Sequence, residues 1–162
     1  MNIEKFQQDL TKAVAESKKT ANWVERQHQR EELVHQQAPQ FFNQLCSHLA
    51  ECIESCRRLY EGGQAVFREP AQSSPNSWTQ KFSRMFKSRS EWIPGSITLE
   101  LHNVELHVKV TAADAMKYSV DAKVQADDNG VVLWVRAGAP LSEDELAELI
   151  LRPVVFDGKS AA

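Results

Sequence analysis

The sequence predicts an α+β protein in which an N-terminal α-helical hairpin packs on an antiparallel β-meander of four to five strands, with a short C-terminal helix. Residues 3–36 contain no glycine or proline and are rich in Gln, Glu, Lys and Ala, which favour helix. Residues 96–136 alternate apolar and polar side chains with the period of two that is typical of strands with one buried face. These two patterns define the class.

A chain of 162 residues is long enough to bury one core, so we expect a single domain over 1–162. No apolar run approaches a membrane span, and the N-terminus lacks the apolar segment of a signal peptide. The three cysteines are an odd number, which predicts a reducing cytoplasm and no disulfide framework. The expected parts are a helical hairpin at 1–63, a short strand, loop and basic amphipathic helix at 64–95, the meander and C-terminal helix at 96–156, and a tail at 157–162.

The first predicted helix is too long for the domain that carries it. A straight helix over residues 3–36 spans about 50 Å, whereas a compact domain of this size has a radius of gyration of about 15 Å. The helix must therefore protrude, break or pair, and we favour pairing with a second copy. One face is apolar, and polar residues interrupt it beyond Ala15; the apolar residues are Ile3, Phe6, Leu10, Ala13, Val14 and Val24.

Pro39 is expected to end this helix and to begin a second one, because proline cannot donate the helical hydrogen bond. An apolar stripe from Phe42 to Tyr60 predicts the second helix, and Gly62-Gly63 is expected to end it. The tight break at Pro39 then makes a helical hairpin.

The segment between the hairpin and the meander combines residues typical of a strand, a loop and a helix. Residues 64–69 suit a short edge strand before Pro70, and residues 70–77 have loop chemistry. Residues 78–87 are predicted to form a short basic amphipathic helix, and Pro94-Gly95 should end the connector.

Two turns define the predicted meander. A turn at His102-Asn103 would pair Leu101 with Val104. A type I′ turn at Asn129-Gly130 would place Ala126 opposite Leu133. The strand at 131–135 is apolar on both sides, which is typical of a strand covered on both faces.

The C-terminal helix has the clearest local signal. Ser142 and Glu145 match a capping box, and Leu141 and Leu146 match a hydrophobic staple. Pro153 is expected to stop this helix, with a further strand at 154–156.

His48, Cys52 and Cys56 follow one another at intervals of four residues on the second predicted helix, with Cys46 nearby. Imidazole and thiolate are zinc ligands, but zinc sites usually draw ligands from at least two elements. We therefore interpret these cysteines as small buried hydrophobic residues and expect no metal and no cofactor.

Two further groups have a possible chemical use. A turn at His102-Asn103 would place Glu100 opposite Glu105 near His107, and paired carboxylates can raise a pKa. We favour a solvated outer face instead. The 78–89 segment suits contact with nucleic acid or a membrane surface, although we favour a helix packed on the sheet; with Trp23 and Val24, its Trp78, Lys81, Arg84, Lys87 and Arg89 form the predicted interaction surface.

No P-loop, dinucleotide-binding, Gly-x-Ser-x-Gly or His-Glu-x-x-His motif is present, which lowers the expectation of an enzyme. The leading hypothesis is a non-catalytic protein-interaction module (an adaptor, inhibitor or chaperone-like partner) that forms a homodimer through its N-terminal helices. The alternative is a small-molecule-binding protein or enzyme with a pocket between helices and sheet. A third hypothesis is nucleic-acid or membrane contact through residues 78–89.

Overall fold

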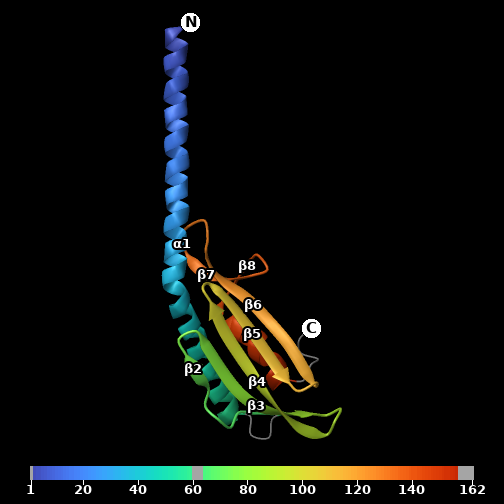
Figure 1. Cartoon of the computed structure of the whole chain (residues 1–162). Helices are drawn as coiled ribbons and strands as arrows, with labels where there is room; N and C mark the ends of the chain where they lie inside the picture. Colours follow the sequence, from blue (N-terminus) through green and yellow to red (C-terminus); the bar gives the residue numbers. More distant parts are fainter. Residues whose placement is uncertain (1, 60–63, 157–162) are drawn as a thin grey trace.

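The computed structural model describes residues 2–59 and 64–156 (Figure 1). A long N-terminal helix is followed by eight antiparallel strands and a short helix. The elements are α1 (Ile3–Leu59), β1 (Ala65–Val66), β2 (Gln72–Ser74), β3 (Ser77–Phe86), β4 (Glu91–His102), β5 (Glu105–Ala112), β6 (Met116–Ala126), β7 (Val132–Arg136), β8 (Ala139–Leu141) and α2 (Glu143–Val155). The α+β class with an antiparallel sheet is therefore confirmed.

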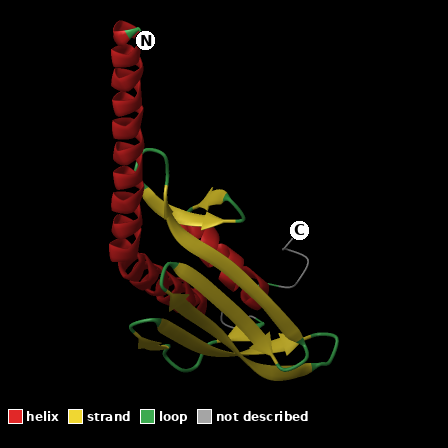
Figure 2. Ribbon diagram, turned by 45° about the horizontal axis from the view of Figure 1, so that its top comes forward, coloured by secondary structure: helices red, strands yellow, loops and turns green. Residues whose placement is uncertain are grey.

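The eight strands form one sheet in the order β1-β3-β4-β5-β6-β7-β8, and β2 pairs with the beginning of β3. The sheet curls into a half-barrel around α2 and the second part of α1 (Figure 2). One continuous core fills the space between the helices and the concave face. Its most deeply buried members are Ala38, Phe42, Leu45, Leu49, Ile97, Leu99, Leu106, Val108, Val110, Ala112, Val124, Leu146, Ile150 and Val154.

The predicted helical hairpin is wrong, because α1 is one continuous helix from Ile3 to Leu59 with Pro39 inside it. Figures 1 and 2 show α1 bending in the part that contains Pro39. A proline inside a helix removes one hydrogen bond and kinks the helix. Here Ala38 and Phe42 on either side of it are buried in the core, so packing keeps the helix together across the kink. The predicted stop at Gly62-Gly63 lies outside the described residues.

The predicted basic helix at 78–87 is also wrong, because these residues form β3. All ten residues of β3 pair with β4, from Ser77 with Glu100 to Phe86 with Glu91. The apolar residues of this segment fit a helical period, but the strand turns a different set inward. The inward-facing side chains are Trp78, Gln80, Phe82, Arg84 and Phe86, all buried.

The connector around β3 contains more strand than the sequence predicts. The strand predicted at 64–69 is only Ala65–Val66, and the loop predicted at 70–77 includes β2. Pro94 and Gly95 lie within β4 rather than ending a connector. β5 pairs with β4 only from Ser96 onward, so Pro94 lies where β4 lacks a second neighbour for the missing N–H.

Both predicted turns exist, but both registers differ from the prediction. His102 pairs with Glu105, so the two-residue turn is Asn103-Val104, and Asn103 adopts the left-handed region with φ 62°. Asparagine tolerates this conformation better than most residues. Leu101 consequently pairs with Leu106 and not with Val104.

The β6–β7 turn is one residue longer than a type I′ turn. Ala126 pairs with Val132 rather than Leu133. The Asp127 carbonyl accepts the Gly130 N–H at 2.9 Å, and the Asp127 carboxylate accepts the N–H groups of Asn129 and Val131. Gly130 has φ 78°, as expected for a three-residue hairpin loop with a bulge.

This longer turn decides which side of β7 faces the core. Trp134 pairs with Val124, and both side chains are buried. Val135, the next residue along, is buried as well, so the expectation of cover on both faces holds for these two residues. It is wrong for Val131, which lies in the turn and is exposed.

The C-terminal helix begins as the sequence predicts. The Ser142 hydroxyl accepts the Glu145 N–H at 3.0 Å. Pro153 does not stop the helix, however, and the predicted strand at 154–156 is wrong, because α2 continues to Val155. Pro153 removes only its own N–H from the helix; the Phe156 N–H still donates to the Arg152 carbonyl oxygen at 2.9 Å. The burial of Val154 and Val155 holds the end of α2 on the core.

Replacing Gly95 with alanine should lower the free energy of unfolding by about 1–3 kcal/mol, because added core atoms force neighbours to move. A Cβ at this position would lie 2.6 Å from the Phe82 ring and 2.5 Å from the Thr111 carbonyl oxygen. Urea unfolding measures the change. The neighbouring substitution Ser96→Ala should stay within about 0.5 kcal/mol, and equal stabilities for both variants would contradict the close packing.

Candidate interaction surfaces

The first part of α1 extends beyond the rest of the protein. Every residue from Asn2 to Arg26 is exposed, and Figure 1 shows this segment standing clear of the sheet. We call residues 2–26 the rod; at 1.5 Å per residue it is about 37 Å long. Beyond the rod, α1 joins the rest of the protein: Arg30 donates to the Asp128 carbonyl oxygen at 2.7 Å, and Val34 is buried.

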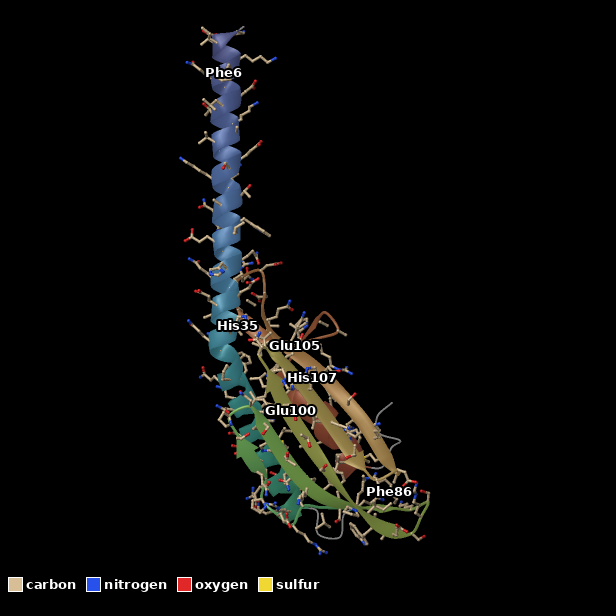
Figure 3. The ribbon with its side chains drawn as sticks, viewed as in Figure 1. Phe6, His35, Phe86, Glu100, Glu105 and His107 are labelled. Atoms are coloured by element: carbon tan, nitrogen blue, oxygen red, sulfur yellow. The ribbon has the colours of Figure 1, made fainter. Side chains whose placement is uncertain are left out.

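One side of the rod carries a row of large apolar side chains. The first four follow one another at intervals of three or four residues, and the fifth comes ten residues later, close to three full turns on, so all lie on the same side of the helix. They are between 48 % and 64 % exposed, and Phe6 is labelled near the free end in Figure 3. We call this row the rod stripe; it consists of Ile3, Phe6, Leu10, Val14 and Val24. Exposed apolar rows of this kind commonly mark interaction sites.

Trp23 and Val24 both lie on the rod, and both are more than half exposed. Adjacent residues of a helix point about 100° apart, so the two side chains do not share one side. Val24 continues the rod stripe and Trp23 lies off it. The predicted interaction surface thus includes one member of the stripe and misses its other four.

The basic residues predicted at 78–89 do not form one surface. Trp78 and Arg84 are buried, with only 3 % and 4 % of their surface exposed. Lys81 faces outward from the middle of β3, whereas Lys87 and Arg89 lie at the β3–β4 turn. Alternate residues of a strand face opposite sides of a sheet, which separates Arg84 from Lys81.

Arg84 has a structural contact that the sequence pattern does not reveal. Its Nε donates to the Val154 carbonyl oxygen and its Nη2 to the Phe156 carbonyl oxygen, both at 3.0 Å. The last carbonyl groups of a helix lack partners within the helix, so Arg84 satisfies the end of α2. At the turn, Arg89 forms an ion pair with Asp114 at 2.6 Å, and this contact lowers the pKa of Asp114.

His48, Cys52 and Cys56 do come together, on the wall of a groove between α1 and α2. The groove has a volume of about 320 Å³ and is lined mainly by apolar surface. His48 Nε2 lies 2.9 Å from Asp144 Oδ1 on the facing helix. Within the described residues, however, no three His, Cys, Asp or Glu side chains are placed to hold a metal ion.

Burial governs the chemistry of the three thiols, which are all free. It raises the pKa of Cys46 to about 12 and raises the pKa values of Cys52 and Cys56 above their ordinary value. The thiolate is both the nucleophile and the metal ligand. The raised pKa values therefore lower the thiolate fraction of these cysteines at neutral pH, most strongly for Cys46.

The outer face of the sheet carries a row of alternating charges. Glu100 and Glu105 do not face each other as predicted; Glu100 lies opposite His107, and Glu105 lies opposite His102 (Figure 3). The turn lies one residue later than predicted, which shifts the pairing partner of each β4 residue by two residues. His107 Nδ1 also lies 2.9 Å from Asp121 Oδ1 on β6, and all five side chains are exposed. Exposed histidine–carboxylate pairs thus stand where the sequence predicted a carboxylate pair.

Sequence reasoning missed Asp121 and Lys117, which lie on the same face of β6, as surface features. Both sit in the polar phase of an alternating strand, which is the ordinary pattern of a solvated face. The residues that lie beside them depend on which strands flank β6, and the sequence alone does not determine the strand order.

Comparison with protein-family models, with curated proteins and with solved structures finds no match to this chain. Among the described residues, no helix is both long and apolar enough to cross a membrane.

Replacing Arg84 with methionine should lower the free energy of unfolding by about 2–4 kcal/mol, because the buried Val154 carbonyl and the partly buried Phe156 carbonyl lose a charged donor. The matched variant Lys81→Met removes an exposed cation from the same strand and should change stability by less than about 0.5 kcal/mol. Urea unfolding of both proteins checks this difference. Equal effects would show that the Arg84 contacts do not stabilise α2.

Alkylation of Cys46 by iodoacetamide at pH 8 should be at least about 100-fold slower in the folded protein than in urea, because a raised pKa lowers the thiolate fraction. Mass spectrometry of timed samples measures the rate at each cysteine. Labelling of Cys46 at equal rates in the two states would contradict its burial.

Proposed function

We propose that this protein is a non-catalytic protein-interaction module that forms a homodimer through its rod. The observation that carries the proposal is the rod stripe: five large apolar side chains on a helical segment that contacts no other described part of the chain. A second rod is the simplest surface that matches an apolar row of this length, because a C2 interface uses the same patch on both copies.

The composition of the rod supports a two-helix contact of moderate strength. Fully burying a side chain such as Leu or Phe contributes about 1.5–3 kcal/mol, and the stripe residues are about half exposed. Ser17 and Thr20 interrupt the row between Val14 and Val24. The contact is therefore concentrated between Ile3 and Val14, where large side chains follow one another at helical spacing.

The charges of the rod favour a protein partner over a membrane or nucleic acid. Its five basic residues are Lys5, Lys12, Lys18, Lys19 and Arg26, and its four acidic residues are Glu4, Asp9, Glu16 and Glu25. Helices that bind membrane surfaces carry mainly basic residues on their polar face. A mixed polar face instead suits a helix that lies against another protein.

In this proposal the rods hold two copies together, and the sheet with α2 binds a further protein. The protein would then serve as an adaptor, inhibitor or chaperone-like partner. Its outer sheet face carries the exposed row of histidines and carboxylates, which can bind a second protein without any catalytic group. The three free cysteines support a reducing compartment such as the cytoplasm.

A second function, binding of a small apolar ligand, is favoured by the groove between α1 and α2. The groove has mainly apolar walls and the polar pair His48–Asp144 at its margin. Ligand sites commonly combine these two features. It differs from the pocket expected between helices and sheet, a space that the core side chains fill.

The double variant Phe6→Asp/Leu10→Asp should weaken self-association at least about 100-fold, since each charge would have to be buried at the contact. Analytical ultracentrifugation over a concentration series measures the dissociation constant. Circular dichroism should show that the helix content is unchanged, because the rod contacts no other described part of the chain.

The matched control is Gln8→Asp/Ala15→Asp, which adds the same charge on the opposite side of the rod. It should dimerise like the natural sequence. A natural protein that sediments as a monomer throughout the series would refute the proposed homodimer.

A further inference from the structure

One side of β6 has no neighbouring strand along the first part of its length. β6 runs from Met116 to Ala126, and β5 pairs with it from Met116 to Lys123. On its other side, β7 pairs only with residues Lys123 to Ala126. Residues 116–122 therefore have no neighbouring strand on that side within the described chain, and Figures 1 and 2 show this part of β6 at the border of the sheet.

The backbone groups that face the open side can be assigned from the hydrogen bonds of β6. The Val124 N–H donates to the Val104 carbonyl oxygen at 2.9 Å, so even-numbered residues of β6 direct their backbone groups toward β5. The odd-numbered residues Lys117, Ser119 and Asp121 consequently direct N–H and C=O groups outward. We call residues 116–122 the open edge.

We propose that the open edge pairs antiparallel with the open edge of a second copy, with the two-fold axis at Ser119. This inference does not rest on the proposed rod contact. Pairing requires outward-facing residues of one copy to oppose outward-facing residues of the other. An axis at Ser119 meets this condition, because Ser119 faces Ser119 and Lys117 faces Asp121 of the second copy.

Charge selects this register over its neighbours. With the axis at Ser119, each Lys117 lies opposite an Asp121, and the two-fold symmetry makes this pair twice. A shift by two residues in one direction would place Lys117 opposite Lys123 of the second copy, where β7 already occupies that side of β6. A shift in the other direction places Lys117 opposite Ser119 and removes both ion pairs. The sequence of the open edge is thus self-complementary in one register.

The inner face of the same register is complementary as well. Tyr118 would lie opposite Val120 of the second copy, an aromatic and β-branched pair of the kind that stabilises sheets. The Tyr118 hydroxyl donates to the Ile150 carbonyl oxygen of α2, which holds the ring in place on the core side. The three outward-facing residues of each copy would form about six inter-chain N–H···O bonds.

The test separates this contact from the rod contact. It uses the full chain with Phe6→Asp/Leu10→Asp, so that any remaining association does not depend on the rod stripe. Ultracentrifugation from about 10 μM to about 1 mM covers the affinities expected for a short strand contact. We expect concentration-dependent dimers in this background, and a monomer at every concentration would overturn the inference while leaving the rod proposal to its own test.

Charge reversal identifies the register. In the same background, Asp121→Lys should weaken the dimer at least about tenfold, because Lys117 would face lysine. The double change Lys117→Asp/Asp121→Lys should restore it with reversed polarity. Lys81→Asp, which reverses an exposed charge on β3, a strand separated from β6 by β4 and β5, should have no effect. Dimers of equal strength in Asp121→Lys, or no rescue by the double change, would overturn the register.

Asp121 also contacts His107, so a second variant and a second measurement exclude an indirect effect. Lys117→Asp leaves that contact intact and should weaken the dimer by a similar factor. Hydrogen exchange should slow with concentration at the amides of 117, 119 and 121, and not in the Asp121→Lys variant. Protection that is independent of concentration at these amides would show that they pair within one chain and would overturn the inference.

Discussion

The structure depends on one contact surface: the side of α1 that packs on the concave face of the sheet. Ala38, Phe42, Leu45 and Leu49 are almost fully buried there, and they lie on both sides of the kink at Pro39. Because this packing spans the proline, the helix continues instead of folding back. A lost hydrogen bond costs less than the burial of several large side chains contributes. The direction of the rod follows from this single continuous helix.

The same packing determines which surfaces remain for other molecules. The sheet uses its concave face for α1 and α2, so its outer face, its open edge and the rod stay exposed. The rod offers apolar side chains, the open edge offers backbone groups and the outer face offers charges. These surfaces differ in chemistry, and each suits a different kind of contact.

The sequence predicted correctly those features of the fold that depend on interactions between residues only a few positions apart. The Ser142–Glu145 cap, the alternation of β4 to β6 and the helical character of residues 3–36 are all present in the structure. The residues of the rod stripe were also recognisable from their spacing. The predictions failed where two local interpretations compete. The apolar residues between Trp78 and Phe86 fit a helix, and Pro39 and Pro153 usually mark helix ends.

The sequence by itself determined the α+β class, the apolar side of the long helix and the start of α2, because helix capping and side-chain periodicity act between neighbours in the chain. Only the tertiary structure decided that α1 stays continuous, that residues 77–86 join the sheet and that Glu100 faces His107. Those outcomes depend on burial and on strand register, which arise between residues far apart in the chain. The open edge of β6 is of the same kind, since the short length of β7 creates it.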